Sequence, residues 1–132
     1  MDWSRIVVLA VLVAHGLGHL IWFLAAWTPI RSGVREGPWI FPGDVTIRHP
    51  IGRLLGLVAL AALACLLAAA WGLLGLQEWW RTATLAGCLL SIVAVAPWLR
   101  QSPGTTPFNA LAADVGLLIF LTLPISQELL VA

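Results

Sequence analysis

Charged residues are scarce in this chain of 132 residues. They make up 10% of the sequence, against about 25% in a typical soluble domain, while hydrophobic residues make up 61%. A sequence this apolar cannot cover its own surface with polar side chains, so we expect lipid to cover much of it. All seven basic residues are arginine, and the formal net charge of +1 gives no case for nucleic acid. The predicted partner is therefore the lipid bilayer.

Cysteine is nearly absent as well. The two cysteines, Cys65 and Cys88, lie inside apolar runs and form neither a CxxC motif nor a zinc-type spacing. We interpret both as small buried hydrophobic residues, with a transient pair between the second and third predicted helices as the alternative. A cleavable signal peptide is not expected, because the first apolar run is too long and no small-x-small cleavage site follows it.

Long apolar runs dominate what is present. A helix needs about 20 apolar residues to cross a hydrocarbon core of ~30 Å, and lipid cannot satisfy free backbone groups. We therefore predict an all-α membrane protein. It is a single transmembrane domain over residues 1–132, a four-helix bundle with a long Pro/Gly-rich loop between helices one and two. The predicted spans are 6–27, 51–76, 82–99 and 107–123.

Prolines mark the limits of these helices. Pro50 and Pro107 stand at the expected first helical positions, where the missing N–H does no harm. Pro124 is expected to bend or end the fourth helix. Tyrosine is absent, but six of the eight tryptophans lie near span ends, where an interfacial belt is expected. These are Trp3, Trp27, Trp71, Trp79, Trp80 and Trp98.

The connection from residue 28 to residue 49 is long for a compact bundle. Long loops are often lids or binding loops, and we expect its apolar centre, residues 39–41, to dip into the interface or the bundle. Four spans place both termini on one side and most arginines on the other, so the positive-inside rule predicts a cytoplasmic loop and external termini in a bacterial plasma membrane. The loop-side arginines are Arg31, Arg35, Arg48, Arg53 and Arg100.

A basic cluster of Arg48, His49 and Arg53 lies where the long loop meets the second helix. We predict that it anchors the chain to anionic lipid headgroups, with recognition of an anionic substrate as the alternative. In the same segment, Gly52 and Gly56 form a GxxxG motif. That motif allows close helix contact, either within the bundle or between copies in a homo-oligomer.

Ionisable residues inside a span are costly and are therefore functional candidates. The first span contains His15 and His19, and the fourth contains Asp114, the only carboxylate in any predicted span. Counting inward from the helix ends at 1.5 Å per residue puts His19 at ~12 Å and Asp114 at ~10 Å. Ser91 of the third span also comes to ~10 Å. These depths predict a polar layer in which His19 faces Asp114.

Two interpretations of this layer stay open. In one, the His–Asp pair only fixes helix packing, as in a structural or assembly subunit of a membrane complex. In the other, His15, His19 and Asp114 bind a metal ion or small ligand, with redox or proton transfer as an associated role. Two imidazoles and a carboxylate suit a divalent metal such as zinc or ferrous iron, with His49 as a fourth ligand. Haem fits less well, because two histidines on one helix face cannot reach opposite faces of a porphyrin.

The segment His15–Leu20 resembles the opening helix of small uncharacterised bacterial four-span proteins with an HGxxHL-type run. The segment Gly104–Asn109 resembles their Gly-Thr…Asn turn. In overall shape this group is similar to DoxX-like membrane proteins. The resemblance implies the architecture and singles out His15, His19 and Asn109, but it implies no reaction.

The sequence thus predicts a small membrane protein with an intramembrane site for a metal or small ligand. The site is formed by His15, His19 and Asp114. The supporting residues are Ser91, Asn109, Trp22 and His49. A membrane enzyme that acts on a lipid or quinone is the further alternative, and no catalytic residue is assigned.

Overall fold

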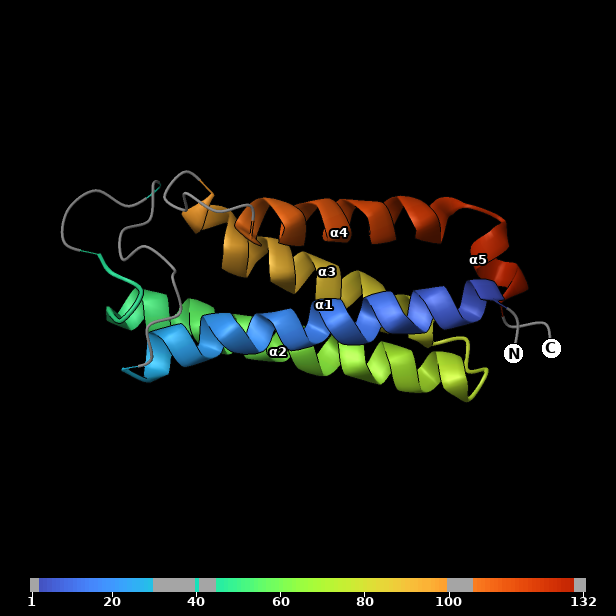
Figure 1. Ribbon diagram of the computed structural model, residues 1–132, viewed down its shortest axis with the longest axis horizontal. Coiled ribbons are helices and arrows are strands. Elements are labelled where there is room, and N and C mark those ends of the chain that lie inside the picture. The colour runs from blue at the N-terminus through green and yellow to red at the C-terminus, as the bar shows by residue number, and fades with distance from the viewer. Residues whose placement is uncertain (1–2, 30–39, 41–44, 100–105, 130–132) are drawn as a thin grey trace.

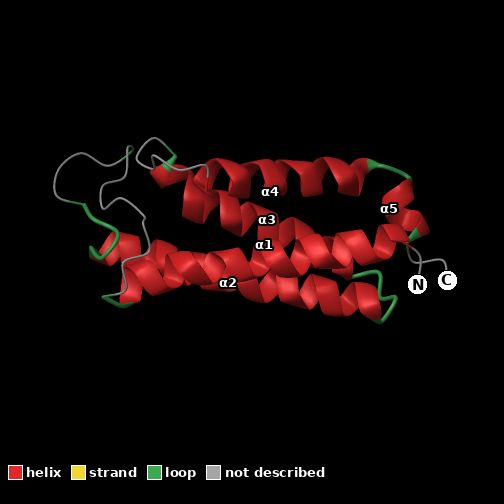
Figure 2. Cartoon of the chain, in the orientation of Figure 1, coloured by secondary structure: helices red, strands yellow, loops and turns green. Residues whose placement is uncertain are grey.

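The described chain is helical throughout its regular structure (Figures 1 and 2). The computed structural model describes residues 3–29, 40, 45–99 and 106–129, and no strand occurs among them. The elements are α1 (Trp3–Trp27), α2 (Pro50–Leu74), α3 (Trp80–Val95), the 3₁₀ turn η1 (Ala96–Trp98), α4 (Thr106–Thr122) and α5 (Ile125–Glu128). Each predicted helix is present, with its ends within about one helical turn of the predicted ones.

Three helices are long and apolar enough to cross a membrane: Trp3–Trp27, Pro50–Leu74 and Trp80–Trp98. The fourth apolar helix, Pro107–Thr122, is shorter. α1 packs along α2, and α2 packs along α3, whereas α4 leans on α3 and touches α1 at few points. Figure 1 shows α4 along one edge of the bundle and α2 along the opposite edge.

Local contacts of a proline, a histidine and an arginine stabilise the two ends of the bundle. Pro50 begins α2, and the ring nitrogen Nδ1 of His49 accepts a hydrogen bond from the Ile51 N–H at 3.3 Å. At the opposite end of the bundle, the buried Arg5 guanidinium donates from Nε to the Leu129 carbonyl at 3.1 Å. This bond brings the start of α1 to the end of α5, so both ends of the described chain lie at the same end of the bundle.

The core contains two tryptophans that the sequence had suggested for the interfacial belt. Trp80 and Trp98 are both buried, and the ring of Trp98 meets that of Trp22 edge-on at 5.9 Å between centroids. That expectation was wrong because proximity to a helix end does not reveal which face of the helix a side chain occupies. Trp3, Trp27, Trp71 and Trp79 are exposed, as a belt requires. Of the centre of the long loop, residues 39–41, only Ile40 is described, and its side chain is exposed rather than inserted into the bundle.

The GxxxG glycines serve contacts within the chain. A Cβ on Gly52 would lie 2.2 Å from the Ile47 carbonyl oxygen, and one on Gly56 would lie 2.8 Å from the Cβ of Ala26. Gly52 therefore lets α2 begin directly against the turn before it, and Gly56 lets α2 approach α1. This favours the intrachain alternative for the motif.

We predict that Gly52→Ala lowers the free energy of unfolding by about 1–3 kcal/mol, because the new methyl group must push the backbone aside. Gly116→Ala is the matched control, since a Cβ there meets nothing within 4 Å. The control should be neutral or stabilising by up to ~1 kcal/mol through helix propensity. Thermal unfolding of the purified variants in detergent measures both effects. Equal melting temperatures for Gly52→Ala and Gly116→Ala would show that the close contact at Gly52 does not contribute to stability.

Candidate functional site

The carboxylate of Asp114 joins three helices inside the bundle. Asp114 is fully buried on α4, and its Oδ1 lies 2.7 Å from Nε2 of His15 on α1. Its Oδ2 accepts a hydrogen bond from the Ser91 hydroxyl on α3 at 2.5 Å. A buried carboxylate is tolerated only with such partners, so these bonds fix where α1, α3 and α4 meet. The predicted polar layer between the three helices is confirmed.

The histidine that bonds Asp114 is His15, not His19 as predicted. The prediction assumed that the end of α1 and the start of α4 lie at the same level. Figure 1 shows that α4 begins further inside the bundle than α1 ends. Counting from the two helix ends therefore misjudged the register by four residues, which is one helical turn or ~6 Å.

His19 lies next to this pair without sharing its bonds. Its side chain is buried, with 1% of its surface exposed, and its ring meets the His15 ring edge-on at 4.9 Å between centroids. Neither ring nitrogen finds a hydrogen-bond partner among the described residues. An unsatisfied buried polar group costs about 1–3 kcal/mol, so a hydrogen-bond partner from beyond the described residues would stabilise this imidazole, as it would the indole N–H groups of Trp80 and Trp98.

Both histidines line a cavity of about 330 Å³ between α1 and α4. Four of its ten lining residues are alanine or glycine, and a Cβ added to Gly18 would meet nothing within 4 Å. The exposed side chains of Val11 and Ile21 form part of the rim, so the cavity opens on the outer surface of the bundle. The remaining lining residues are Ala14, Trp22, Asn109, Ala110 and Ala113.

The supporting residues fall into two places. Ser91 bonds Asp114, and Trp22 and Asn109 line the cavity, so these three surround the site. His49 does not, because its Nδ1 caps the start of α2. Cys65 and Cys88 are free thiols. Cys88 is buried as expected, whereas Cys65, also expected to be buried, is only half-buried.

A metal centre is not what the described residues assemble. No group of three or more His, Cys, Asp or Glu side chains in the described part of the chain is arranged to hold a metal ion. The reason is visible in the bonds: Asp114 is engaged by His15 and Ser91, while the His19 nitrogens remain outside that pair. Of the three predicted ligands, only His15 and Asp114 are joined by a hydrogen bond.

The basic cluster lies elsewhere, where the long loop meets α2. Arg48 and Arg53 are exposed there. The Arg53 guanidinium carbon lies 5.6 Å from the centroid of the Trp27 ring, and Trp27 Nε1 donates to the Arg53 carbonyl at 3.2 Å. An exposed Arg–Trp pair at a helix end suits a membrane interface, and headgroup binding there stays a prediction.

Comparison with protein-family models, with curated proteins and with solved structures finds no match to this chain.

Proposed function

We propose that this protein is an integral membrane protein that binds a small lipid-soluble ligand with a polar head between α1 and α4. The supporting observation is the buried His19, whose two ring nitrogens lack partners among the described residues and which lines the cavity. The volume of about 330 Å³ lies at the lower end of the ~300–1,000 Å³ typical of ligand pockets. The α1–α4 opening would give such a ligand direct access from the bilayer.

The polar head is expected to carry a carbonyl or hydroxyl group. A neutral imidazole offers one N–H donor and one acceptor nitrogen, and both are unused on His19. The ring of a quinone fits this description, since its carbonyl oxygens accept hydrogen bonds and its body is apolar. The adjacent Asp114–His15 pair could exchange a proton with the bound head, which would make binding proton-linked. A membrane enzyme acting on a lipid or quinone is a narrower version of this proposal.

A second candidate function is structural. The carboxylate of Asp114 already bonds two other helices, which is what a packing role in a structural or assembly subunit requires. This alternative explains Asp114, His15 and Ser91. It does not explain why a buried imidazole next to them is left unsatisfied beside an open cavity.

The cavity can be filled without disturbing the fold. We predict that Gly18→Leu abolishes ligand binding while the protein still folds. Gly18 lines the cavity, so a leucine there would occupy ligand space, and its Cβ would meet nothing within 4 Å. The probe is a decyl-substituted benzoquinone added to purified protein in detergent. At about 100 times its Kd it should stabilise the wild type by ~2.7 kcal/mol, seen as a higher melting temperature. Gly116→Leu, also in open space but away from the cavity, should keep that shift. An equal quinone response in Gly18→Leu would refute binding at this cavity.

Asp114→Asn separates the two functions, and Asp114→Leu measures what the two bonds of the carboxylate contribute to stability. Asp114→Asn keeps shape and hydrogen bonding, so a purely structural pair predicts a mild effect on stability. If the site binds a polar head or moves protons, Asp114→Asn should weaken quinone binding while the melting temperature without quinone stays near that of the wild type. Asp114→Leu leaves His15 and Ser91 unpartnered and should lose ~1–3 kcal/mol of stability in either case. Unchanged quinone binding in Asp114→Asn would favour the structural role.

We also propose a bacterial plasma membrane location, which rests on the resemblance to small bacterial four-span proteins. The arginine distribution favours an orientation with the 28–49 loop in the cytoplasm and the termini outside. The exposed residues Arg48 and Gln77 lie at opposite ends of α2 and suit a labelling test. In a variant with Cys65 and Cys88 replaced by alanine, Gln77→Cys should react with an impermeant thiol reagent on intact cells, and Arg48→Cys should not. The opposite pattern would reverse the orientation.

A further inference from the structure

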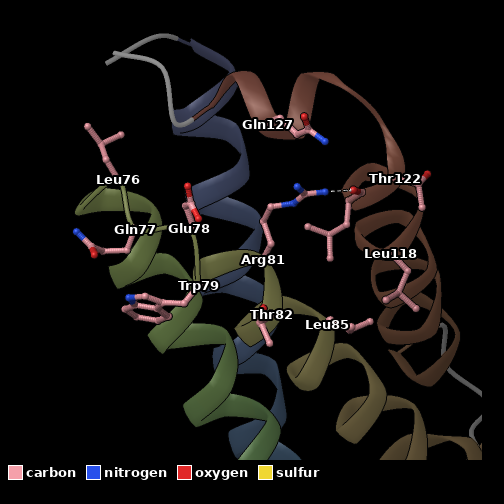
Figure 3. Close-up of a pocket in the computed structure, with 11 residues that line it drawn as sticks. Leu76, Gln77, Glu78, Trp79, Arg81, Thr82, Leu85, Leu118, Thr122 and Gln127 are labelled. Carbon is pink, nitrogen blue, oxygen red and sulfur yellow. Dashed lines mark hydrogen bonds between the residues drawn. The ribbon is translucent and has the colours of Figure 1, made fainter.

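A second hollow lies at the other end of the bundle, near both ends of the described chain (Figure 3). Its volume is about 1370 Å³, and it lies between the α2–α3 connection on one side and the α4–α5 segment on the other. It exists because α4 departs from its neighbours toward this end. None of the residues of the His15–His19 cavity contributes to it.

Arg81 crosses this groove from the first turn of α3. Figure 3 shows its side chain extended toward α4, where Nη2 donates to the Leu121 carbonyl at 2.6 Å. This is its one side-chain hydrogen bond among the described residues. A guanidinium carries five N–H donors, so most of the donors of this half-buried group remain for an outside acceptor. Phosphate oxygens match the planar arrangement of these donors well.

A negative charge lies on the same groove. Glu78 is exposed in the α2–α3 connection and lines the groove with Arg81, but no ion pair joins the two side chains in the described chain. A groove with one unpaired positive and one unpaired negative group is complementary to a zwitterion. A free anion is less well matched, because Glu78 would repel it.

The groove continues from these charges onto apolar side chains. Leu85 of α3 and Leu118 of α4 line it further along the bundle, on the side away from the connection (Figure 3). Charged groups at the end of the helices and leucines toward their middle match the two parts of an amphiphile that lies along the bundle. A wholly water-soluble ligand would leave the leucines uncovered.

We propose that this groove binds a phospholipid with a zwitterionic amine headgroup. The phosphate is bound by Arg81, the amine lies toward Glu78, and an acyl chain covers Leu85 and Leu118. This site is separate from the His15–His19 cavity, and the proposal does not depend on a ligand there. It requires only that this end of the bundle lies at a membrane surface.

The test is lipid titration of purified, delipidated protein in detergent, followed by melting temperature and by native mass spectrometry. Phosphatidylethanolamine should bind and stabilise the protein more than phosphatidylglycerol does, and diacylglycerol should have no effect. Glycerophosphoethanolamine, which has the same headgroup without acyl chains, should also have no effect.

Arg81→Gln should weaken phosphatidylethanolamine binding about tenfold, as expected for the loss of charge-assisted hydrogen bonds. Glu78→Gln should remove the preference over phosphatidylglycerol.

Two matched controls make the result decisive. Arg48→Gln removes an exposed arginine of the basic cluster at the other end of the bundle, which is predicted to bind anionic headgroups, so it should leave the binding of zwitterionic phosphatidylethanolamine unchanged. Leu118→Trp should block the acyl chain, whereas Ile119→Trp, on the 57% exposed neighbouring position, should not. Equal losses in Arg81→Gln and Arg48→Gln would show diffuse charge attraction and overturn the site. Equal binding of diacylglycerol, or phosphatidylglycerol binding that is lost in Arg81→Gln and is as tight as that of phosphatidylethanolamine, would overturn the headgroup assignment.

Discussion

The buried carboxylate of Asp114 is the constraint on which the arrangement of the helices depends. A charge at this depth in an apolar bundle costs several kcal/mol unless it is paired, so the fold must bring partners to it. Both oxygens are used, one toward α1 through His15 and one toward α3 through Ser91. Since α4 has few other contacts with α1, the His15 bond is the main polar link between these two helices, while the packing of α4 against α3 adds to the Ser91 bond.

The same bond leaves the neighbouring histidine unused. Once His15 has taken the carboxylate, His19 lies one turn further along α1, next to a cavity walled by small residues such as Gly18 and Ala113. A bulky residue at either position could have filled this space and left only a structural pair. The combination of a satisfied carboxylate, an unsatisfied imidazole and open volume supports a binding role more strongly than any of the three residues does alone.

The sequence was sufficient to predict the helices, but not their register. Apolar runs and the prolines at positions 50 and 107 predicted the helix limits, because helix formation in lipid depends on local sequence. The choice between His15 and His19 depended on the axial position of α4 against α1, which tertiary packing determines. The prediction that Trp80 and Trp98 belong to the interfacial belt failed for a related reason, since the face that a helix buries depends on its neighbours. The groove at Arg81 had no sequence signal, because it arises from the divergence of whole helices.

α4 forms a wall of both hollows. Ala110 and Ala113 face the His cavity, and Leu118 and Leu121 face the groove at Arg81. Between them lies Asp114, and near the end of the helix the Leu121 carbonyl accepts the bond from Arg81. This helix packs mainly against α3 and touches α1 at few points. A molecule in either hollow would contact it, so any coupling between the two sites must act through the position of α4, and by linkage it must be reciprocal.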